Sequence, residues 1–175
     1  TNDNYATDIF KPLIDASIEL TNSEKFIKSP SHRVIADHLK SASFLISDGV
    51  LPSNEGRGYV LRRIMRRGMR HAHTLGNKDP IFHKIFPFLL KQMKESYPEL
   101  ERAKDLIVTT LFNEESKFKQ TIDNGLKILN DEINQTSNKQ FSGEIAFKLY
   151  DTYGFPLDLT QDYLKTKNMN VNLKQ

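Results

Sequence analysis

Tyr59-Val-Leu-Arg-Arg-Ile-Met-Arg-Arg-Gly-Met-Arg-His-Ala72 alternates apolar and basic residues at the spacing of a helix. At about 100° per residue, the apolar and basic side chains fall on opposite halves of the helical wheel. The apolar half holds Val60, Leu61, Ile64, Met65, Gly68, Met69 and Ala72, and the basic half holds Arg62, Arg63, Arg66, Arg67 and Arg70. The stretch therefore predicts a helix with one face in a core and the other turned toward something anionic.

The positive charge of the chain is concentrated around this helix. The net charge is only +3, but six arginines lie between Arg57 and Arg70, and no acid occurs from Gly56 to Lys78. Without these six, 19 basic residues face 22 acidic ones. Each like-charge pair three or four residues apart costs about 0.2 to 0.5 kcal/mol, with no nearby acid in the sequence to relieve it. A solvated face is the ordinary interpretation of a charge run, but this cost and the bidentate fit of arginine to phosphate favour a nucleic acid partner.

Apolar residues at helical spacing extend to both sides of the basic helix. We expect a first helix from Thr7 or Asp8 to about Asn22, and a second from Ser31, its predicted N-cap, to Ile46. Beyond the basic helix, a long helix is expected over 98–134, either continuous or interrupted, and a polar stretch over 135–140 ends it. A short helix capped by Ser142 and a last helix near 158–167 complete the chain. No strand pattern of useful length occurs, so the predicted fold is all-α, with a single helical domain over 1–175.

Composition excludes several classes of function. The chain has no cysteine, which excludes disulfides, thiolate zinc sites and cysteine nucleophiles. No apolar run approaches the roughly 18 residues that span a bilayer, and the first ten residues lack a signal-peptide pattern, so we expect a cytoplasmic protein without a membrane partner. His32, Asp37 and His38 do not share one helical face, so no metal site is expected, and no catalytic constellation is evident.

Two polar residues outside the basic helix attract a functional interpretation. Asn54 lies in the glycine-containing loop that leads into the basic helix, where its amide offers both a donor and an acceptor, although turn chemistry is an alternative. Asp151 falls at a helix end beside Gly154, where a capping role is the alternative. Tyr59 is interpreted as a core residue, with a stacking role left open.

Three stretches of the chain resemble the alanyl-tRNA synthetase family. They are Ser31-His-Arg-Val-Ile-Ala-Asp-His-Leu39, the run from Phe44 through Pro52-Ser-Asn-Glu-Gly-Arg-Gly-Tyr-Val-Leu-Arg-Arg-Ile-Met-Arg-Arg67, and Ala146-Phe-Lys-Leu-Tyr-Asp-Thr-Tyr-Gly-Phe-Pro-Leu-Asp-Leu-Thr160. Asn4-Tyr5 with Asp8-Ile9-Phe10 resembles the stretch after the family's last catalytic motif, so residues 1–28 are expected to form a lead-in helix from the catalytic core. The resemblance covers essentially the whole chain.

The resemblance implies a class II enzyme that activates alanine with ATP and transfers it to the terminal adenosine of tRNA. It places the catalytic core, with ATP and Mg²⁺, upstream of this segment and a zinc-containing editing domain downstream. The segment itself is then expected to hold no cofactor, to be inactive alone, and to have the tRNA acceptor stem and those other domains as partners.

The same resemblance assigns site residues. Asn54 and Asp151 correspond to the family's pair that reads the G·U wobble of the acceptor stem. The backbone of the stem would be held first by Arg63, Arg67 and Arg70, and secondarily by Arg57 and Arg66. A wobble guanine leaves its exocyclic amine unpaired in the wide minor groove of A-form RNA, and a carboxylate is its natural acceptor. Two alternatives remain: a helical docking surface for the other domains, and a generic RNA-binding module.

Overall fold

The computed structural model describes residues 5, 7–23, 28–135, 140–167 and 169–172. The chain divides into two compact units, Thr1–Phe118 and Lys119–Gln175. The expectation of a single domain over 1–175 stays a prediction. Asn4 of the lead-in stretch and positions 136–139 of the expected polar stretch lie outside the described residues.

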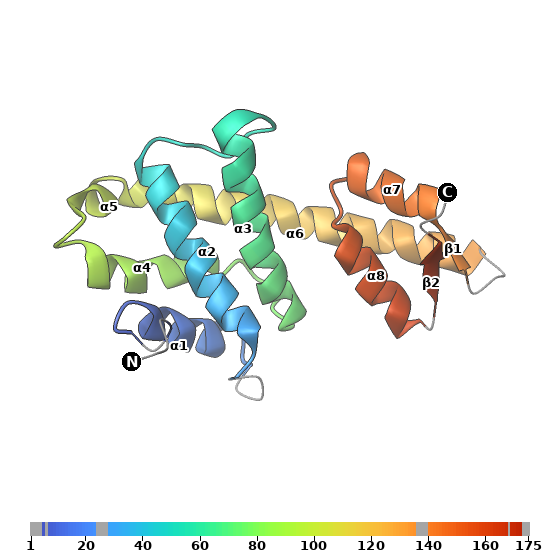
Figure 1. The fold of residues 1–175 in the computed structure, drawn as a ribbon, viewed down its shortest axis with the longest axis horizontal. Helices are drawn as coiled ribbons and strands as arrows, with labels where there is room; N and C mark the ends of the chain where they lie inside the picture. Colours follow the sequence, from blue (N-terminus) through green and yellow to red (C-terminus); the bar gives the residue numbers. More distant parts are fainter. Residues whose placement is uncertain (1–4, 6, 24–27, 136–139, 168, 173–175) are drawn as a thin grey trace. The chain divides into compact units, whose positions relative to one another are not determined.

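The first unit is built around two helices that pack along each other (Figure 1). These are α2 (Pro30–Ser47) and α3 (Gly56–Thr74), and α1 (Phe10–Leu20), α4 (Phe82–Met93) and α5 (Pro98–Arg102) lie against this pair. The shared core consists of side chains with no exposed surface, contributed by all the main helices: Leu13, Ile35, Leu39, Ile46, Leu61, Met65, Phe82 and Phe86. This apolar core fixes the orientation of α3 and therefore decides which of its residues face solvent.

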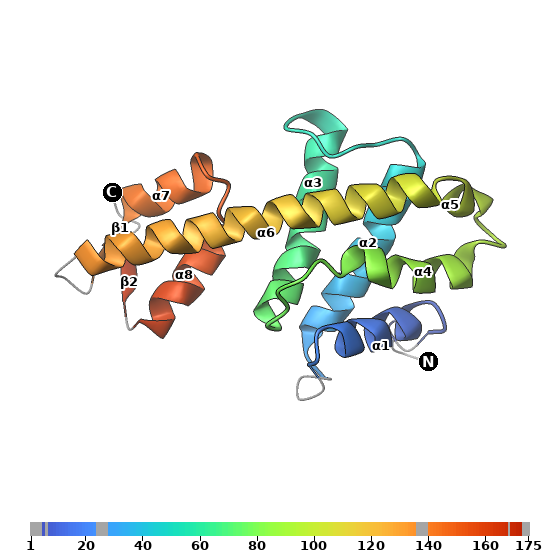
Figure 2. The ribbon, with the colours of Figure 1, turned by 180° about the vertical axis from the view of Figure 1, so that it is seen from behind.

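A buried carboxylate joins α4 to the first part of the long helix α6 (Lys104–Gln135). Glu115 Oε2 accepts from the backbone amides of Ile81 and Phe82, both at 2.9 Å. These amides begin α4 and lack partners within the helix, so the carboxylate caps it and complements the helix dipole. Figure 2 shows this part of α6 running across α2 and α3. The contact fixes the face of α6 that α3 meets.

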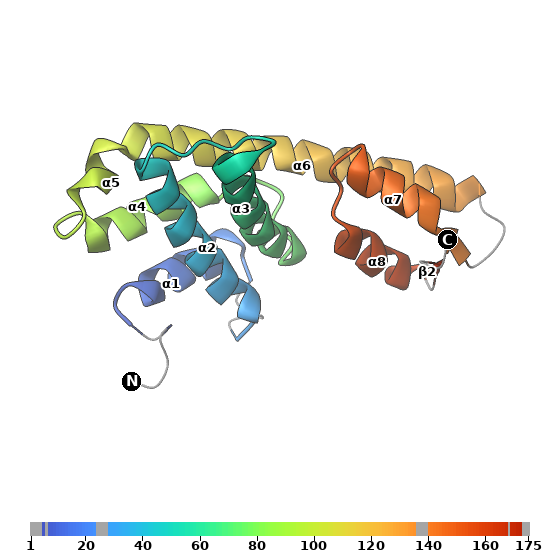
Figure 3. The same ribbon diagram turned by 45° about the horizontal axis from the view of Figure 1, so that its top comes forward.

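The second unit contains the rest of α6 together with α7 (Gly143–Asp151) and α8 (Leu157–Thr166), which Figure 3 shows beside it. Its core holds Phe141, Leu149, Phe155 and Leu164. Two short strands, β1 (Gln140–Ser142) and β2 (Asn170–Asn172), pair in parallel with Phe141 opposite Val171. The pair therefore joins the segment before α7 to the segment after α8.

The all-α class is confirmed, and most expected helices occur within a few residues of their predicted bounds. The predicted N-cap of α2, Ser31, is wrong. The N-cap is Ser29, whose hydroxyl accepts from the Ser31 amide, because Pro30 occupies the first helical position. The long helix is interrupted at Ala103, between α5 and α6. The β1–β2 pair is a correction to the expectation of no strands, since three residues are too few to show an alternating pattern. Helix α4 had no counterpart among the expectations.

None of the helices, within the residues described, is long and apolar enough to cross a membrane.

Candidate nucleic-acid interface

Helix α3 turns its apolar face into the core of the first unit. Leu61, Met65, Met69 and Ala72 are buried, as the wheel predicted, and Gly68 lies among them. Val60 was expected on the buried face but is 54% exposed, because it lies at the edge of the apolar stripe, in the first turns of the helix. The remaining circumference of α3 carries the arginines, which fall into two groups with different neighbours.

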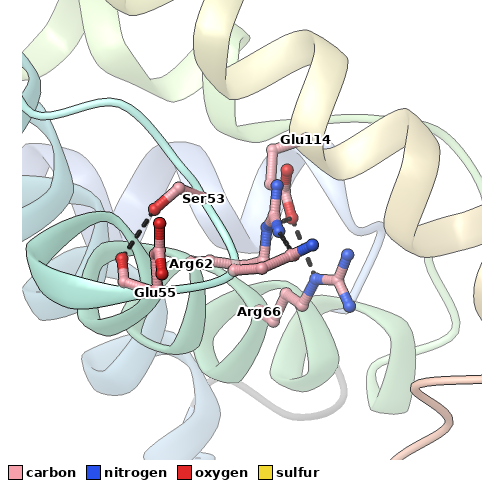
Figure 4. Close-up of polar contacts among 6 residues, drawn as sticks. Ser53, Glu55, Arg62, Arg66 and Glu114 are labelled. Atoms are coloured by element: carbon pink, nitrogen blue, oxygen red, sulfur yellow. Dashed lines mark hydrogen bonds and ion pairs between the residues drawn. The ribbon is translucent and has the colours of Figure 1, made fainter.

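Arg62 and Arg66, called here the paired row, converge on one carboxylate of α6 (Figure 4). Arg62 Nε and Arg66 Nε donate to the same oxygen, Glu114 Oε1, at 3.1 and 2.9 Å. The Glu114 side chain is only 4% exposed, whereas the two arginines keep 22% and 27% of theirs. The Arg66 guanidinium also lies over the Phe118 ring, 5.2 Å from its centroid. The expectation that no acid relieves the arginine repulsion is therefore wrong.

Arg63 and Arg67, called here the open row, project to solvent on the other side of the arginine face. The Arg63 guanidinium lies 5.8 Å from the centroid of Tyr59, whose side chain is 43% exposed. The interpretation of Tyr59 as a core residue is therefore wrong, since the loop before α3 leaves this position uncovered. Arg57 is also exposed, while Arg70 is half-buried. Exposed guanidinium groups on a rigid helix can bind phosphate without rearranging the core.

The loop that leads into α3 is packed tightly against its first turn. A Cβ at Gly58 would lie 2.2 Å from Ser53 Oγ and 2.3 Å from the Leu51 carbonyl oxygen, so only glycine permits this approach. Ser53 Oγ donates to the Glu55 carbonyl at 2.7 Å, which stabilises the turn (Figure 4). Between them, Asn54 is exposed, and its Oδ1 accepts from Arg62 Nη1. The loop therefore holds the Asn54 amide beside the paired row.

Asp151, in the second unit, is the last residue of α7 and is exposed. Gly154 follows with φ of 66°, and the Phe155 amide donates to the Leu149 carbonyl at 2.9 Å, which closes the turn. A carboxylate cannot cap this helix end, because the groups left there are carbonyl acceptors and the dipole is negative. The Asp151 side chain makes no hydrogen bond or ion pair with any residue the structure describes. A carboxylate at the negative end of a helix dipole is unfavourable, which argues against a capping role for Asp151.

The end of Asp151's helix is also rich in exposed aromatic side chains. Phe147, Tyr150 and Tyr153 are 63%, 53% and 44% exposed. The pattern of the sequence had grouped Phe147 with the apolar residues of this helix, which are otherwise buried or half-buried. One face of α7 and the turn after it therefore present a carboxylate among uncovered rings.

The charges of nearby arginines act on two histidines, His71 of α3 and His38 of α2. His71 Nδ1 lies 3.0 Å from Ser31 Oγ, and burial lowers the pKa of His71, with the charges of Arg70, His38 and Arg67 acting in the same direction. Burial also lowers the pKa of His38, against the opposing effect of Asp37. Both rings are therefore held toward their neutral forms.

His32, one of the histidines considered as a metal ligand, has a structural role instead. His32 is fully buried, with Ser17 Oγ and Ser23 Oγ at 2.9 and 3.1 Å from its two ring nitrogens. Its role is to join α1 to α2. Across the described part of the chain, no three histidine, aspartate or glutamate side chains gather as a metal site would require.

The candidate site residues are thus distributed between the two units. Asn54 and the arginines belong to the first unit, and Asp151 belongs to the second. Asn54, Asp151, Arg57, Arg63 and Arg67 are exposed, and Arg66 and Arg70 are half-buried. Their binding roles stay predictions. Sequence reasoning missed Glu114, because its pairing with Arg62 and Arg66 joins residues 52 and 48 positions apart in the chain.

Comparison with known proteins identifies relatives along the whole chain. The family model described as "tRNA synthetases class II (A)" matches residues 1–175. The alanine–tRNA ligase of Paramagnetospirillum magneticum is 60% identical over 175 residues, which cover 98% of this chain and 20% of that protein. The alanine–tRNA ligases of Ruegeria pomeroyi and Sphingopyxis alaskensis are 59% and 57% identical, with the same coverage. The chain spans about a fifth of the length of these curated relatives.

Proposed function

Because the chain belongs to the class II (A) tRNA synthetase family, we propose that it recognises the acceptor stem of alanine tRNA within an alanine–tRNA ligase. The ligase joins alanine to tRNA at the expense of ATP. In this proposal the chain contributes recognition, and ATP with Mg²⁺ and the zinc of the editing domain belong to other parts of the enzyme. The observation that carries it is the Asn54 amide, which Arg62 holds at the start of the helix that exposes Arg63 and Arg67.

The open row would supply affinity. Arg63 and Arg67 are exposed on a helix whose other face is fixed in the core, so their guanidinium groups are available to phosphate oxygens. Arg57 lies near the same end as Asn54, and Arg70 extends the arginine face by a further turn. Contacts of this kind hold an RNA backbone without reading its sequence.

Asn54 and Asp151 would supply selectivity. A carboxylate near RNA is repelled by phosphate, so its presence is explained by a specific donor such as the exocyclic amine of a wobble guanine. The exposed position of Asp151 at a helix end that disfavours negative charge supports this role. Both residues would then touch one G·U pair in the minor groove, which in RNA is open to side chains.

The test separates recognition from alanine activation. In the intact protein, Asn54→Ala and Asp151→Ala should each lower charging of alanine tRNA about tenfold or more, the value of one or two lost base contacts. Alanine-dependent pyrophosphate exchange should be unchanged, because activation precedes tRNA binding. Phe88→Ala serves as a matched control, since this exposed residue of α4 lies outside the site. Equal loss of exchange and charging would contradict the proposal.

Docking against other domains is the competing function for the arginine face, and Glu114 shows that two of its members do pair with an acid. Salt distinguishes the two functions. Binding of an acceptor-stem duplex through phosphate contacts should weaken steeply as salt rises. Binding that is insensitive to salt would assign the arginines to protein contacts. A generic RNA-binding module would bind G·U and G·C stems with equal affinity.

A further inference from the structure

We propose that Glu114 and Arg62 are positioning residues that fix the Asn54 amide so that its Nδ2 group, a hydrogen-bond donor, is the one presented to RNA. The inference rests on the proposed function, which gives Asn54 a partner in the acceptor stem. Glu114 and Arg62 thereby join the residues that support recognition, and Asn54 becomes the hydrogen-bond donor in its contact with RNA. The three side chains form a chain of hydrogen bonds from the buried face of α6 to the exposed loop before α3.

The polarity follows from the chemistry of arginine. A guanidinium group has only donors, so the atom of Asn54 that faces Arg62 must be the carbonyl oxygen Oδ1. Because the amide is planar, Nδ2 then points to the other side of the group. Asn54 is exposed, and its Nδ2 makes no hydrogen bond within the part of the chain that the structure describes. The group of this side chain that has no partner in the described structure is therefore the Nδ2 donor.

Arg62 is held in place by two contacts through different nitrogens. Its Nε donates to Glu114 Oε1 at 3.1 Å, and its Nη1 donates to Asn54. Glu114 is in turn fixed, because it is 4% exposed and Arg66 Nε donates to the same oxygen. Two bonds from one planar group define the orientation of its plane, which a single flexible ammonium could not do.

The loop backbone is fixed as well. Gly58 brings the first turn of α3 against Ser53 and Leu51, and the Ser53 hydroxyl bonds the Glu55 carbonyl. Asn54 therefore has both its backbone and its side chain ordered before any partner binds. Order of this kind lowers the entropy lost on binding and raises the discrimination between correct and incorrect partners.

An outward donor defines the chemistry of its RNA partner. The minor groove presents acceptors at pyrimidine O2, purine N3 and the ribose 2′-oxygen, and the amide nitrogen of Asn54 can donate to any of these. Asp151 carries the opposite polarity, because a carboxylate only accepts. The two residues would thus demand one acceptor and one donor from the stem, a stricter requirement than either makes alone.

Two arginine-to-lysine variants of the intact protein test the relay. Arg62→Lys keeps the charge, but one Nζ cannot replace Nε and Nη1 together, whereas Arg63→Lys changes an open-row arginine outside the relay. The measurement is the ratio of dissociation constants for two acceptor-stem duplexes that differ only in G·U against G·C. We expect Arg62→Lys to lower the preference for G·U about tenfold, the value of one ordered base contact, with an unchanged salt slope. Arg63→Lys should keep the wild-type preference.

Two further variants keep the test decisive if Arg62→Lys loses stability, which a thermal unfolding curve reports. Asn54→Asp retains an oxygen for Arg62 but turns an acceptor outward, so the preference for G·U should disappear. Glu114→Gln keeps an acceptor for Arg62 without the charge and should lower the preference by a smaller factor. Retention of the full preference in Asn54→Asp, or equal loss in Arg62→Lys and Arg63→Lys, overturns the relay. A wild-type protein that binds both stems equally would overturn the proposed function itself.

Discussion

The two arginine rows of α3 lie on one helix face, yet their neighbours differ. The paired row, Arg62 and Arg66, is three-quarters buried against the carboxylate of Glu114, and the open row, Arg63 and Arg67, meets solvent. The single carboxylate of Glu114 offsets one of the two positive charges of the paired row, whereas neither arginine of the open row pairs with an acid among the described residues. Identical residues of one helix face therefore have different neighbours: Arg62 of the paired row bonds Asn54 in the loop before α3, and the open row keeps its guanidinium groups exposed.

Removal of Glu114 should change the free energy of unfolding more than removal of an open-row arginine. Glu114→Ala leaves the Nε groups of Arg62 and Arg66 without their shared acceptor, and we expect the free energy of unfolding to fall by about 1 to 3 kcal/mol. Arg67→Ala, in the open row, should change it by less than about 0.5 kcal/mol. Urea unfolding, with unchanged dependence on denaturant, measures both. Similar losses in the two variants would mean that the rows do not differ in structural role.

The open row should dominate the salt dependence of RNA binding. Arg67→Ala is expected to reduce the slope of log affinity against log salt by about one, because one phosphate contact is lost. Arg66→Ala should reduce it by less than half as much, since Glu114 and Phe118 already occupy its guanidinium. Titration of an acceptor-stem duplex at four salt concentrations provides both slopes. A larger change for Arg66→Ala would reverse the assignment of the rows.

A smaller effect of the open row should be visible in the pH dependence of stability. Burial, with the charges of Arg70, His38 and Arg67, lowers the pKa of His71 below its ordinary 6.5. The folded protein then binds fewer protons than the unfolded chain, so this contribution to stability is present above pH 6.5 and is lost as the pH falls toward the folded pKa. Unfolding free energies at pH 7.5 and about 5.5 should therefore differ less in Arg67→Gln than in the wild type. An unchanged difference between the two unfolding free energies would show that Arg67 does not affect the pKa of His71.

Local pattern was sufficient to predict much of this molecule. The period of apolar residues placed the helices, and the wheel of α3 assigned Leu61, Met65 and Met69 to the core. Glycine chemistry placed the turn after Asp151, where Gly154 has positive φ. These features depend on residues within a few positions of one another, which is the range that periodicity and turn preferences report.

The features that pattern missed depend on contacts between distant segments. Glu114 lies one residue before Glu115, yet one carboxylate bonds two arginines of α3 and the other caps α4, and nothing in the sequence distinguishes the two. Tyr59 and Val60 were placed in the core because the wheel does not show which part of a helix its neighbours cover. The G·U-reading roles of Asn54 and Asp151 came from family resemblance and stay predictions.

The central claim, that Asn54 and Asp151 act on one wobble pair, is tested most directly by a double-mutant cycle read on the ratio of charging rates for G·U and G·C tRNAs. If both side chains contact the same pair, either alanine substitution removes most of the selectivity, and the double variant should be little worse than the more severe single one. Independent effects, in which the two losses of selectivity multiply, would contradict the claim.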